Sequence, residues 1–172
     1  MKIIIINGPC GIGKSTVAEK VHSNIPLSFL LDIDAQRRFV SGRREHPKES
    51  GKMVMTISQN ILETCLQLGV DVVIDKMTFD KDGLDFYYKI AEKYDADIYE
   101  IILFASKELV IKRAAARGYD IEGGAGLFTP QKCEYFWEEI NKIKDTREKA
   151  HIINVEELSE REVYLEIKNV IN

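Results

Sequence analysis

The fold of this chain is decided by one stretch near its start, KIIIINGPCGIGKST (residues 2–16). The apolar run at 3–6 is typical of a strand that is buried on both faces of a sheet. The segment KSTVAEKVHS (14–23) carries Val17 and Val21 at helical spacing. A glycine-rich turn therefore lies between a predicted strand and a predicted helix, which is the context that a phosphate-binding loop requires.

The turn itself has the spacing of such a loop: Gly8, four residues, then Gly13, Lys14 and Ser15. Glycine adopts backbone angles that are closed to other residues, so the amides after Gly8 can point into one concavity, where the dipole of the following helix favours an anion. Lys14 can reach the β- and γ-phosphates of ATP, and the Ser15 hydroxyl can bind Mg²⁺. We predict an ATP site made by the following residues: Gly8, Gly11, Ile12, Gly13, Lys14, Ser15 and Thr16.

The length, charge and cysteine content of the chain indicate a globular protein and argue against nucleic-acid and membrane partners. At 172 residues and a formal net charge of −4, the chain suits one globular domain, and its acidity argues against nucleic acid as the main partner. No apolar run approaches the roughly 20 residues that span a bilayer, so we expect no membrane partner, and the chain starts on a predicted strand, so we expect no signal peptide. Three cysteines without C-x-x-C spacing suit a reducing cytoplasm: Cys10, Cys65 and Cys133.

Strand-like and helix-like patterns alternate along the whole chain. We predict strands at 2–6, 27–33, 70–75, 97–105 and 151–155. We predict helices at about 14–23, 51–68, 83–94, 106–117, 130–144 and 159–170. Runs that are apolar on consecutive residues indicate a parallel sheet covered by helices on both faces, in a single domain over residues 1–172. The glycine-rich stretch at 117–130 is the longest segment that we expect to be irregular.

Two acids follow the second predicted strand, in LLDIDAQRR (30–38). Asp32 and Asp34 alternate with Ile33, so both carboxylates are predicted to point the same way off the strand, at the edge where ligands of open parallel sheets bind. One of these carboxylates can accept the proton of an attacking hydroxyl, and the other can hold Mg²⁺ through water. Arg37 can bind an anionic acceptor. The alternative is an Asp that caps the next helix, followed by solvated arginines.

Three further residues complete the candidate site. Asp75 ends the apolar run VDVVID (70–75), as a Walker B acid does, and can reach the Mg²⁺ shell. Arg113 and Arg117 are four residues apart on a predicted helix and therefore share one face. Arginines at that position can offset charge on a transferred phosphoryl group. For Asp75 the alternative is an Asp that ends a strand in a turn. For the two arginines it is a solvated helix face.

Taken together, GPCGIGKST, DIDAQR, VVID and RAAARG resemble the small P-loop kinases: shikimate and gluconate kinases, nucleoside monophosphate kinases and the kinase domain of polynucleotide kinase. The resemblance covers most of the chain. It implies a three-layer α/β P-loop NTPase fold with a five-stranded parallel sheet of order 2-3-1-4-5. It also implies an acceptor-binding segment at about 35–68, a mobile lid at about 117–130, and ATP and Mg²⁺ as cofactors.

The same resemblance suggests roles for individual residues. The D-x-D at 32 and 34 is similar to that of shikimate kinase, in which the first acid serves Mg²⁺ and the second the substrate hydroxyl. The D-x-x-R of Asp34 and Arg37, with the arginines at 113 and 117, is similar to polynucleotide kinase, in which the Asp is the general base and the lid arginines contact ATP. In adenylate kinase a D-x-x-R arginine holds an acceptor nucleotide, so the motif leaves hydroxyl and phosphate acceptors open. DKMTFDKDG (75–83) replaces the Gly-Gly-Gly of shikimate kinase, which puts shikimate in doubt.

The charge of residues 35–52 bears on the acceptor. This stretch holds six Lys or Arg and two Glu, a local charge of +4, in an acidic protein. It would attract a phosphorylated or carboxylated acceptor, although a solvated charged loop has the same composition. The sequence predicts a kinase that phosphorylates a hydroxyl of a small metabolite. The alternatives are a nucleoside or nucleotide kinase, a polynucleotide 5′-hydroxyl kinase, and a non-catalytic ATP-binding module.

Overall fold

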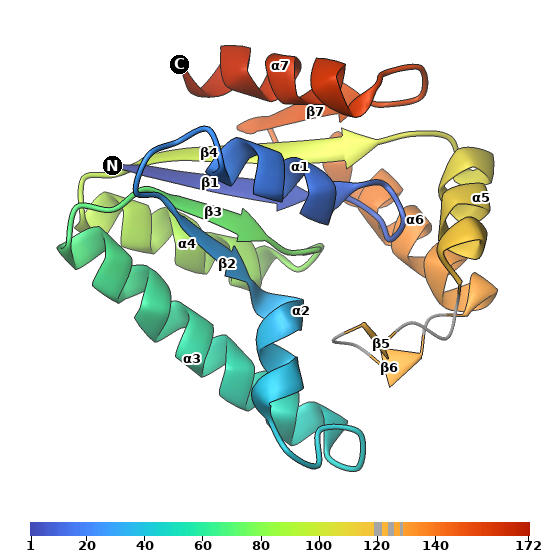
Figure 1. The fold of residues 1–172 in the computed structure, drawn as a ribbon, viewed down its shortest axis with the longest axis horizontal. Coiled ribbons are helices and arrows are strands. Elements are labelled where there is room, and N and C mark those ends of the chain that lie inside the picture. The colour runs from blue at the N-terminus through green and yellow to red at the C-terminus, as the bar shows by residue number, and fades with distance from the viewer. Residues whose placement is uncertain (119–121, 124–125, 128) are drawn as a thin grey trace.

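The computed structural model describes residues 1–118, 122–123, 126–127 and 129–172. A parallel sheet lies between two layers of helices, in the three-layer α/β arrangement that the sequence predicts (Figure 1). The strands of this sheet are β1 (Lys2–Asn7), β2 (Phe29–Asp32), β3 (Val72–Asp75), β4 (Asp97–Phe104) and β7 (Ala150–Asn154). Their order is β2-β3-β1-β4-β7, and every neighbouring pair is parallel. Counting only these five strands, this is the predicted order 2-3-1-4-5.

The longer helices are α1 (Lys14–His22), α3 (Pro47–Gln67), α4 (Lys81–Lys93), α5 (Lys107–Arg117), α6 (Pro130–Lys144) and α7 (Glu160–Ile171). The short elements are α2 (Ile33–Gln36), the 3₁₀ helix η1 (Arg37–Phe39), and the antiparallel pair β5 (Glu122–Gly123) and β6 (Gly126–Leu127). Helices α1 and α7 cover one face of the sheet, and α3 and α4 cover the other (Figure 1). Helices α5 and α6 pack against each other.

The isoleucine run of β1 is apolar on every residue because both of its faces are buried. Ile4 and Ile6 belong to the core that includes buried side chains of α1 and α7. Ile3 and Ile5 belong to the core that includes buried side chains of α3 and α4. All four side chains are fully buried, and each contributes about 1.5–3 kcal/mol of hydrophobic stabilisation. The central strand is thereby held rigidly in front of the glycine-rich turn that follows it.

The predicted strand over 27–33 is wrong at its end, because the chain becomes helical at Ile33. Asp32 causes this change of conformation: its Oδ1 accepts a hydrogen bond from the backbone N–H of Ala35 at 2.8 Å, which caps α2. Asp34 therefore lies in the first turn of a helix. The two carboxylates are not alternate side chains of one strand, and the capping alternative applies to Asp32.

The predicted lid falls partly outside the described residues. Arg117 ends α5, Gly118 follows it with a φ of 89°, and the short strands β5 and β6 come next. Residues 119–121, 124–125 and 128 lie outside the part of the chain that the structure describes. The predicted acceptor segment at 35–68 corresponds to the end of α2, to η1 and to α3.

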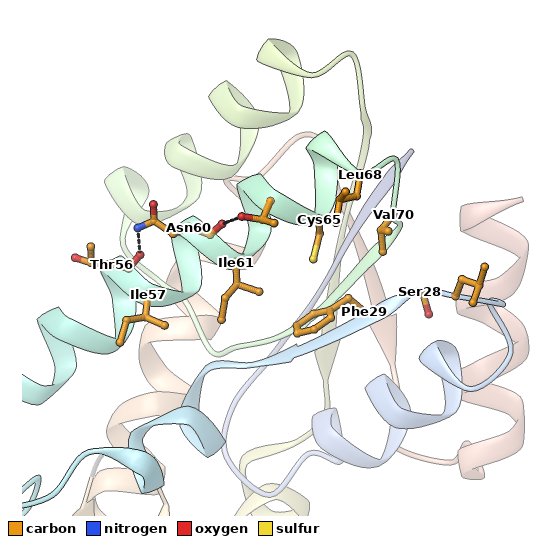
Figure 2. A pocket seen from close by; sticks show the side chains of 11 residues that line it. Ser28, Phe29, Thr56, Ile57, Asn60, Ile61, Cys65, Leu68 and Val70 are labelled. Atoms are coloured by element: carbon orange, nitrogen blue, oxygen red, sulfur yellow. Dashed lines mark hydrogen bonds between the residues drawn. The ribbon is translucent and has the colours of Figure 1, made fainter.

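An apolar groove of about 650 Å³ lies between the edge strand β2 and α3. Both elements contribute apolar side chains to it, and Figure 2 shows Phe29 on the strand below Ile61 of the helix. Leu27, at the amino end of β2, is 93% exposed. The groove thus begins at the opposite end of β2 from Asp32 and from the phosphate loop. In the part of the chain that the structure describes, every helix is too short or too polar to span a bilayer.

Candidate nucleotide and acceptor site

The turn between β1 and α1 has the backbone conformation of a loop that closes around a ligand. Gly8, Gly11 and Gly13 all have positive φ values, of 141°, 74° and 104°. A Cβ atom at Gly8 would lie 2.5 Å from the carbonyl oxygen of Leu103, so only glycine lets the loop pack directly on β4. A Cβ atom at Gly13, in contrast, would have no heavy atom within 4 Å. The loop is therefore packed on one side and open at the N-terminus of α1.

Helix α5 packs against the same loop through backbone atoms. A Cβ atom at Gly11 would lie 3.0 Å from the backbone nitrogen of Ala114 and 3.1 Å from the carbonyl oxygen of Val110. Cys10, the preceding loop residue, forms a buried cluster with Ala114 and with Cys133 of α6. The phosphate loop is thus fixed to the helix that carries the two predicted arginines.

Lys14 and Ser15 begin α1 and place two functional groups beside the loop. The Lys14 ammonium folds back over the loop and donates to the carbonyl oxygen of Pro9 at 2.9 Å. The Ser15 side chain lies near the carboxylate of Asp75, at the end of β3, and acts to lower the pKa of that group. The structure therefore brings together Lys14 and Ser15 at the start of α1 with Asp75 at the end of β3, as the Walker A and Walker B patterns predict.

Asp75 is buried among charges of both signs. Its burial raises the pKa of its carboxyl group, while Lys14 and Ser15 act in the opposite direction. Asp32 and Asp34 lie near enough to raise this pKa further. Asp32 is also the direct register partner of Asp75 across the β2–β3 pair. The three predicted acids thus share one electrostatic environment at the carboxyl ends of β2 and β3.

The donor set fits a Mg²⁺ ion held chiefly by nucleotide and water oxygens. Ser15 and Asp75 lie near each other, which places a hydroxyl and a carboxylate beside the loop. Asp32 has one oxygen engaged as the α2 cap. No group of three or more His, Cys, Asp or Glu side chains in the described ranges is arranged to hold a metal ion by itself.

Arg37, predicted to bind the acceptor, makes its visible contacts with the start of α3. Its Nη2 donates to the carbonyl oxygen of Pro47 at 3.0 Å and to the Ser50 hydroxyl at 3.4 Å. Its Nε is buried and has no hydrogen-bond partner among the described residues. Arg37 therefore holds η1 against α3, on the side of the molecule that carries Asp34.

The two predicted lid arginines lie in different environments. Arg113 is half-buried and lies near Glu156, in the connection between β7 and α7. Hydrogen bonds from the backbone and side chain of Ser106 lower the pKa of Glu156, and the charge of Arg113 adds to this effect. Arg117 is exposed at the end of α5.

Sequence reasoning missed a buried polar network beneath the phosphate loop. Asn7 Oδ1 accepts hydrogen bonds from the backbone N–H groups of Gly8 at 2.8 Å and of Thr78 at 3.0 Å. Its Nδ2 donates to the Thr78 carbonyl oxygen at 2.8 Å and to Glu100 at 3.4 Å. Glu100 forms an ion pair with Arg147. A signal was available for Glu100, because it interrupts the otherwise apolar run of β4.

The position of Lys76 beside the candidate site was also not predicted from the sequence. This residue directly follows Asp75, and its backbone N–H donates to the Ile6 carbonyl oxygen at 3.3 Å. Its charge lies close to those of Asp34 and Asp80. Nothing in the local pattern marks Lys76, since its surroundings are formed by α2, α3 and the start of α4.

Comparison with solved structures shows the same fold at low sequence identity. The tunicamycin resistance protein of Deinococcus radiodurans is 17% identical, with a TM-score of 0.65, and the match covers 99% of this chain and 96% of that one. A kinase-like protein of Chloroflexus aurantiacus is 16% identical, with a TM-score of 0.72 and coverage of 98% and 97%. A gluconokinase of Sinorhizobium meliloti is 14% identical, with a TM-score of 0.69 and coverage of 96% and 88%. At these identities the likeness establishes the P-loop kinase fold, as the sequence motifs predict.

No curated protein sequence matches the chain. A family model described as AAA domain matches residues 3–125, which include the phosphate loop, Asp34, Asp75 and both lid arginines. Because this match extends over more than half of the sequence, the chain belongs to that AAA domain family.

Proposed function

We propose that this protein is an ATP- and Mg²⁺-dependent kinase that transfers the γ-phosphoryl group of ATP to a hydroxyl of a small metabolite. The observation that carries the proposal is the grouping at the carboxyl ends of β1, β2 and β3. There the loop lysine Lys14 and the Ser15–Asp75 pair share one electrostatic environment with Asp34. A phosphate site with a carboxylate beside it is the arrangement that phosphoryl transfer to a hydroxyl requires.

Each group has a proposed part in the reaction. The loop amides and Lys14 bind the β- and γ-phosphates, and Ser15 and Asp75 hold the metal with its water shell. Bound Mg²⁺ would supply positive charge to the phosphate oxygens. Asp34 accepts the proton of the acceptor hydroxyl while the hydroxyl oxygen bonds to the γ-phosphorus, and the bond to the bridging oxygen breaks to release ADP.

We assign the arginines and the remaining acids by their positions. Arg113 lies toward the β7–α7 connection and is proposed to face the adenine side, whereas Arg117, at the end of α5, is proposed to reach the phosphates. Arg37 and the 35–68 segment form the acceptor side. Of the two candidate metal acids we favour Asp75 over Asp32, because Asp32 caps α2. The three free cysteines suit a reducing cytoplasm.

Two features support a small, anionic metabolite as the acceptor. The chain is similar over nearly its whole length to a gluconokinase. Residues 35–52 also carry a net charge of +4, which favours a small anionic molecule. The nucleotide kinase alternative keeps one specific point in its favour: an Arg in the D-x-x-R motif can hold an acceptor phosphate, and the buried Nε of Arg37 has no partner among the described residues.

The first experiment is a screen of ADP release against pools of metabolites. A kinase shows turnover that rises with one acceptor, whereas a non-catalytic ATP-binding module hydrolyses ATP slowly whatever is added. Lys14→Ala is the control variant: it should remove the stimulated turnover while the protein stays folded, since a lost charge-assisted phosphate contact costs at least ~2–4 kcal/mol in the transition state. Stimulation that survives in folded Lys14→Ala would contradict the phosphate-loop assignment.

Asp34→Asn then separates the two kinase proposals. The substitution keeps the shape of the side chain and removes its basicity, so with a hydroxyl acceptor kcat should fall about 10²-fold or more. A phosphate acceptor is already anionic at pH 7 and needs no base, so the loss would be modest. Steady-state kinetics with the acceptor found in the screen gives the answer.

A further inference from the structure

We propose that Lys76 binds an anionic group of the acceptor, so that the enzyme selects hydroxylated metabolites that carry a carboxylate or phosphate. This inference rests on the proposed kinase function and specifies the acceptor class at the same site. Lys76 would act as a specificity-determining residue beside the proposed base, Asp34.

The backbone of Lys76 is fixed in the sheet, and its side chain crosses to the acceptor side. The residue follows Asp75 at the end of β3, and its N–H donates to the Ile6 carbonyl oxygen at 3.3 Å. Its Nζ reaches α3, where it lies 2.7 Å from the Sδ of Met55. The ammonium group is therefore held against α3, which is part of the proposed acceptor segment.

The hydrogen bonding of this ammonium is weak for a partly buried cation. An ammonium group has three donors, and a thioether sulfur is a poor acceptor. Within the described part of the chain, Met55 is the one side chain that accepts from Lys76. The Lys76 residue is partly buried, and the carboxylates of Asp34 and Asp80 lie within electrostatic range of its ammonium group. A partly dehydrated cation with spare donors is suited to a carboxylate or phosphate ligand.

The position of Lys76 links such a ligand to the chemistry. The charges of Asp34 in α2 and of Asp80, the residue that caps α4, act on its ammonium group, and Met55 belongs to α3. The ammonium thus lies where three elements of the acceptor side converge, within electrostatic range of the proposed base. An acceptor whose anionic group is bound by Lys76 would have a neighbouring hydroxyl close to Asp34.

The first test measures binding without turnover. At pH 8 the protein is treated briefly with acetic anhydride, and acetylation of each lysine is quantified by mass spectrometry. The additions are sorbitol (neutral), gluconate (a carboxylate), and 6-phosphogluconate and AMP (phosphates), each with a non-hydrolysable ATP analogue. We expect at least one anionic addition to reduce acetylation of Lys76 severalfold, with no protection by sorbitol. Protection by gluconate would indicate a carboxylate ligand, and protection by AMP alone would indicate a phosphate ligand. Protection by none of the anions, or equal protection by sorbitol, overturns the inference.

The second test uses kinetics with the acceptor found by ADP release. Lys76→Met removes the charge at similar length, and we expect KM for an anionic acceptor to rise about 10-fold or more while KM for ATP stays constant. Lys76→Arg should recover part of the loss, because it restores an anion-binding charge. Lys81→Met is the matched control, since the Lys81 side chain is 86% exposed and pairs with Asp85 at the surface of α4.

The outcomes separate this inference from the proposed function. An efficient neutral acceptor, or an unchanged acceptor KM in Lys76→Met, overturns the role of Lys76 and leaves the kinase proposal in place. A shift of the kcat–pH profile without a change in KM would instead mean that Lys76 acts only through Asp34, which also overturns the inference. If no acceptor stimulates ADP release, the kinase proposal fails, while the acetylation experiment still decides whether Lys76 binds anions.

Discussion

At the scale of single residues, Asp75 shows a conflict between stability and function. The carboxylate must be ionised to serve a metal ion, yet burial raises its pKa. A carboxyl group whose pKa is raised by folding favours the native state below its unfolded pKa, near 3.9, and this contribution is lost as the pH rises through the native value. The free protein therefore carries an electrostatic cost at neutral pH, which bound metal and nucleotide would offset.

We expect Asp75→Asn to be more stable than the wild type at pH 8 in the absence of nucleotide, because the amide carries no charge to bury. The difference should shrink as the pH falls, because the raised pKa lets the wild-type carboxyl group take up a proton at a higher pH than an ordinary aspartate does. Thermal unfolding of both proteins at several pH values measures this, and ATP turnover should be strongly reduced in the variant at every pH. A Tm difference that does not depend on pH would contradict the assigned cause.

Cys10 is a second residue for which burial decides reactivity. Its side chain is 8% exposed, and burial, followed by a hydrogen bond with Cys133, raises its pKa to about 12. At pH 8 the thiol is therefore almost entirely protonated, and the thiolate is the reactive form. We expect iodoacetamide to leave the native loop unmodified, and urea to expose all three cysteines to labelling. Rapid labelling of native Cys10 with loss of ATP binding would show that the loop opens.

At the scale of elements, the contact between α5 and the phosphate loop depends on Gly11. Gly11→Ala would force a left-handed φ of 74° on alanine and would push its Cβ to 3.0 Å from Ala114 N. Gly69→Ala is a close control, because Gly69 has a φ of 75° and no heavy atom within 4 Å of a Cβ position. The control should lose about 1–2 kcal/mol of unfolding free energy from the backbone alone.

Gly11→Ala should lose more than this control and should also bind ATP at least about 10-fold more weakly, because the loop must shift away from α5. Urea unfolding and titration with a fluorescent ATP analogue measure the two effects. Equal stability losses in the two variants, with ATP affinity unchanged, would show that the loop tolerates the displacement.

Most helices and strands could be predicted from the sequence, because the pattern of apolar residues that identifies each of them is local. The isoleucines of β1 and the helical spacing of α3 follow from which faces are buried, and the sheet order follows from the motifs. The end of β2 was not predictable in the same way, since DID fits a strand as well as a capped helix, and the Asp32–Ala35 bond decides between them. The surroundings of Lys76 depend on tertiary contacts with Met55 that no spacing reveals.

At the scale of the whole molecule, the buried network joins parts of the chain that are distant in sequence. Asn7 connects the start of the phosphate loop to Thr78, beyond β3. Glu100 in β4 joins Asn7 to Arg147, in the turn before β7. The Glu100 side chain is completely buried, and its Oε2 has no hydrogen-bond partner among the described residues. One ion pair therefore neutralises a carboxylate at the centre of the fold, directly below the site.

Removing only the cation should be costly. Arg147→Met leaves the Glu100 carboxylate buried without a counter-charge, and we expect a loss of about 3–5 kcal/mol of unfolding free energy. The double variant Glu100→Gln/Arg147→Met removes both charges and should recover most of this loss, since a buried pair replaced as a unit is often close to neutral. Urea unfolding of the wild type, both single variants and the double variant completes the cycle. If the double variant is as unstable as Arg147→Met, the cost lies in lost packing and hydrogen bonds of the arginine. The network would then stabilise the loop through packing and hydrogen bonds, and the charges of Glu100 and Arg147 would contribute little.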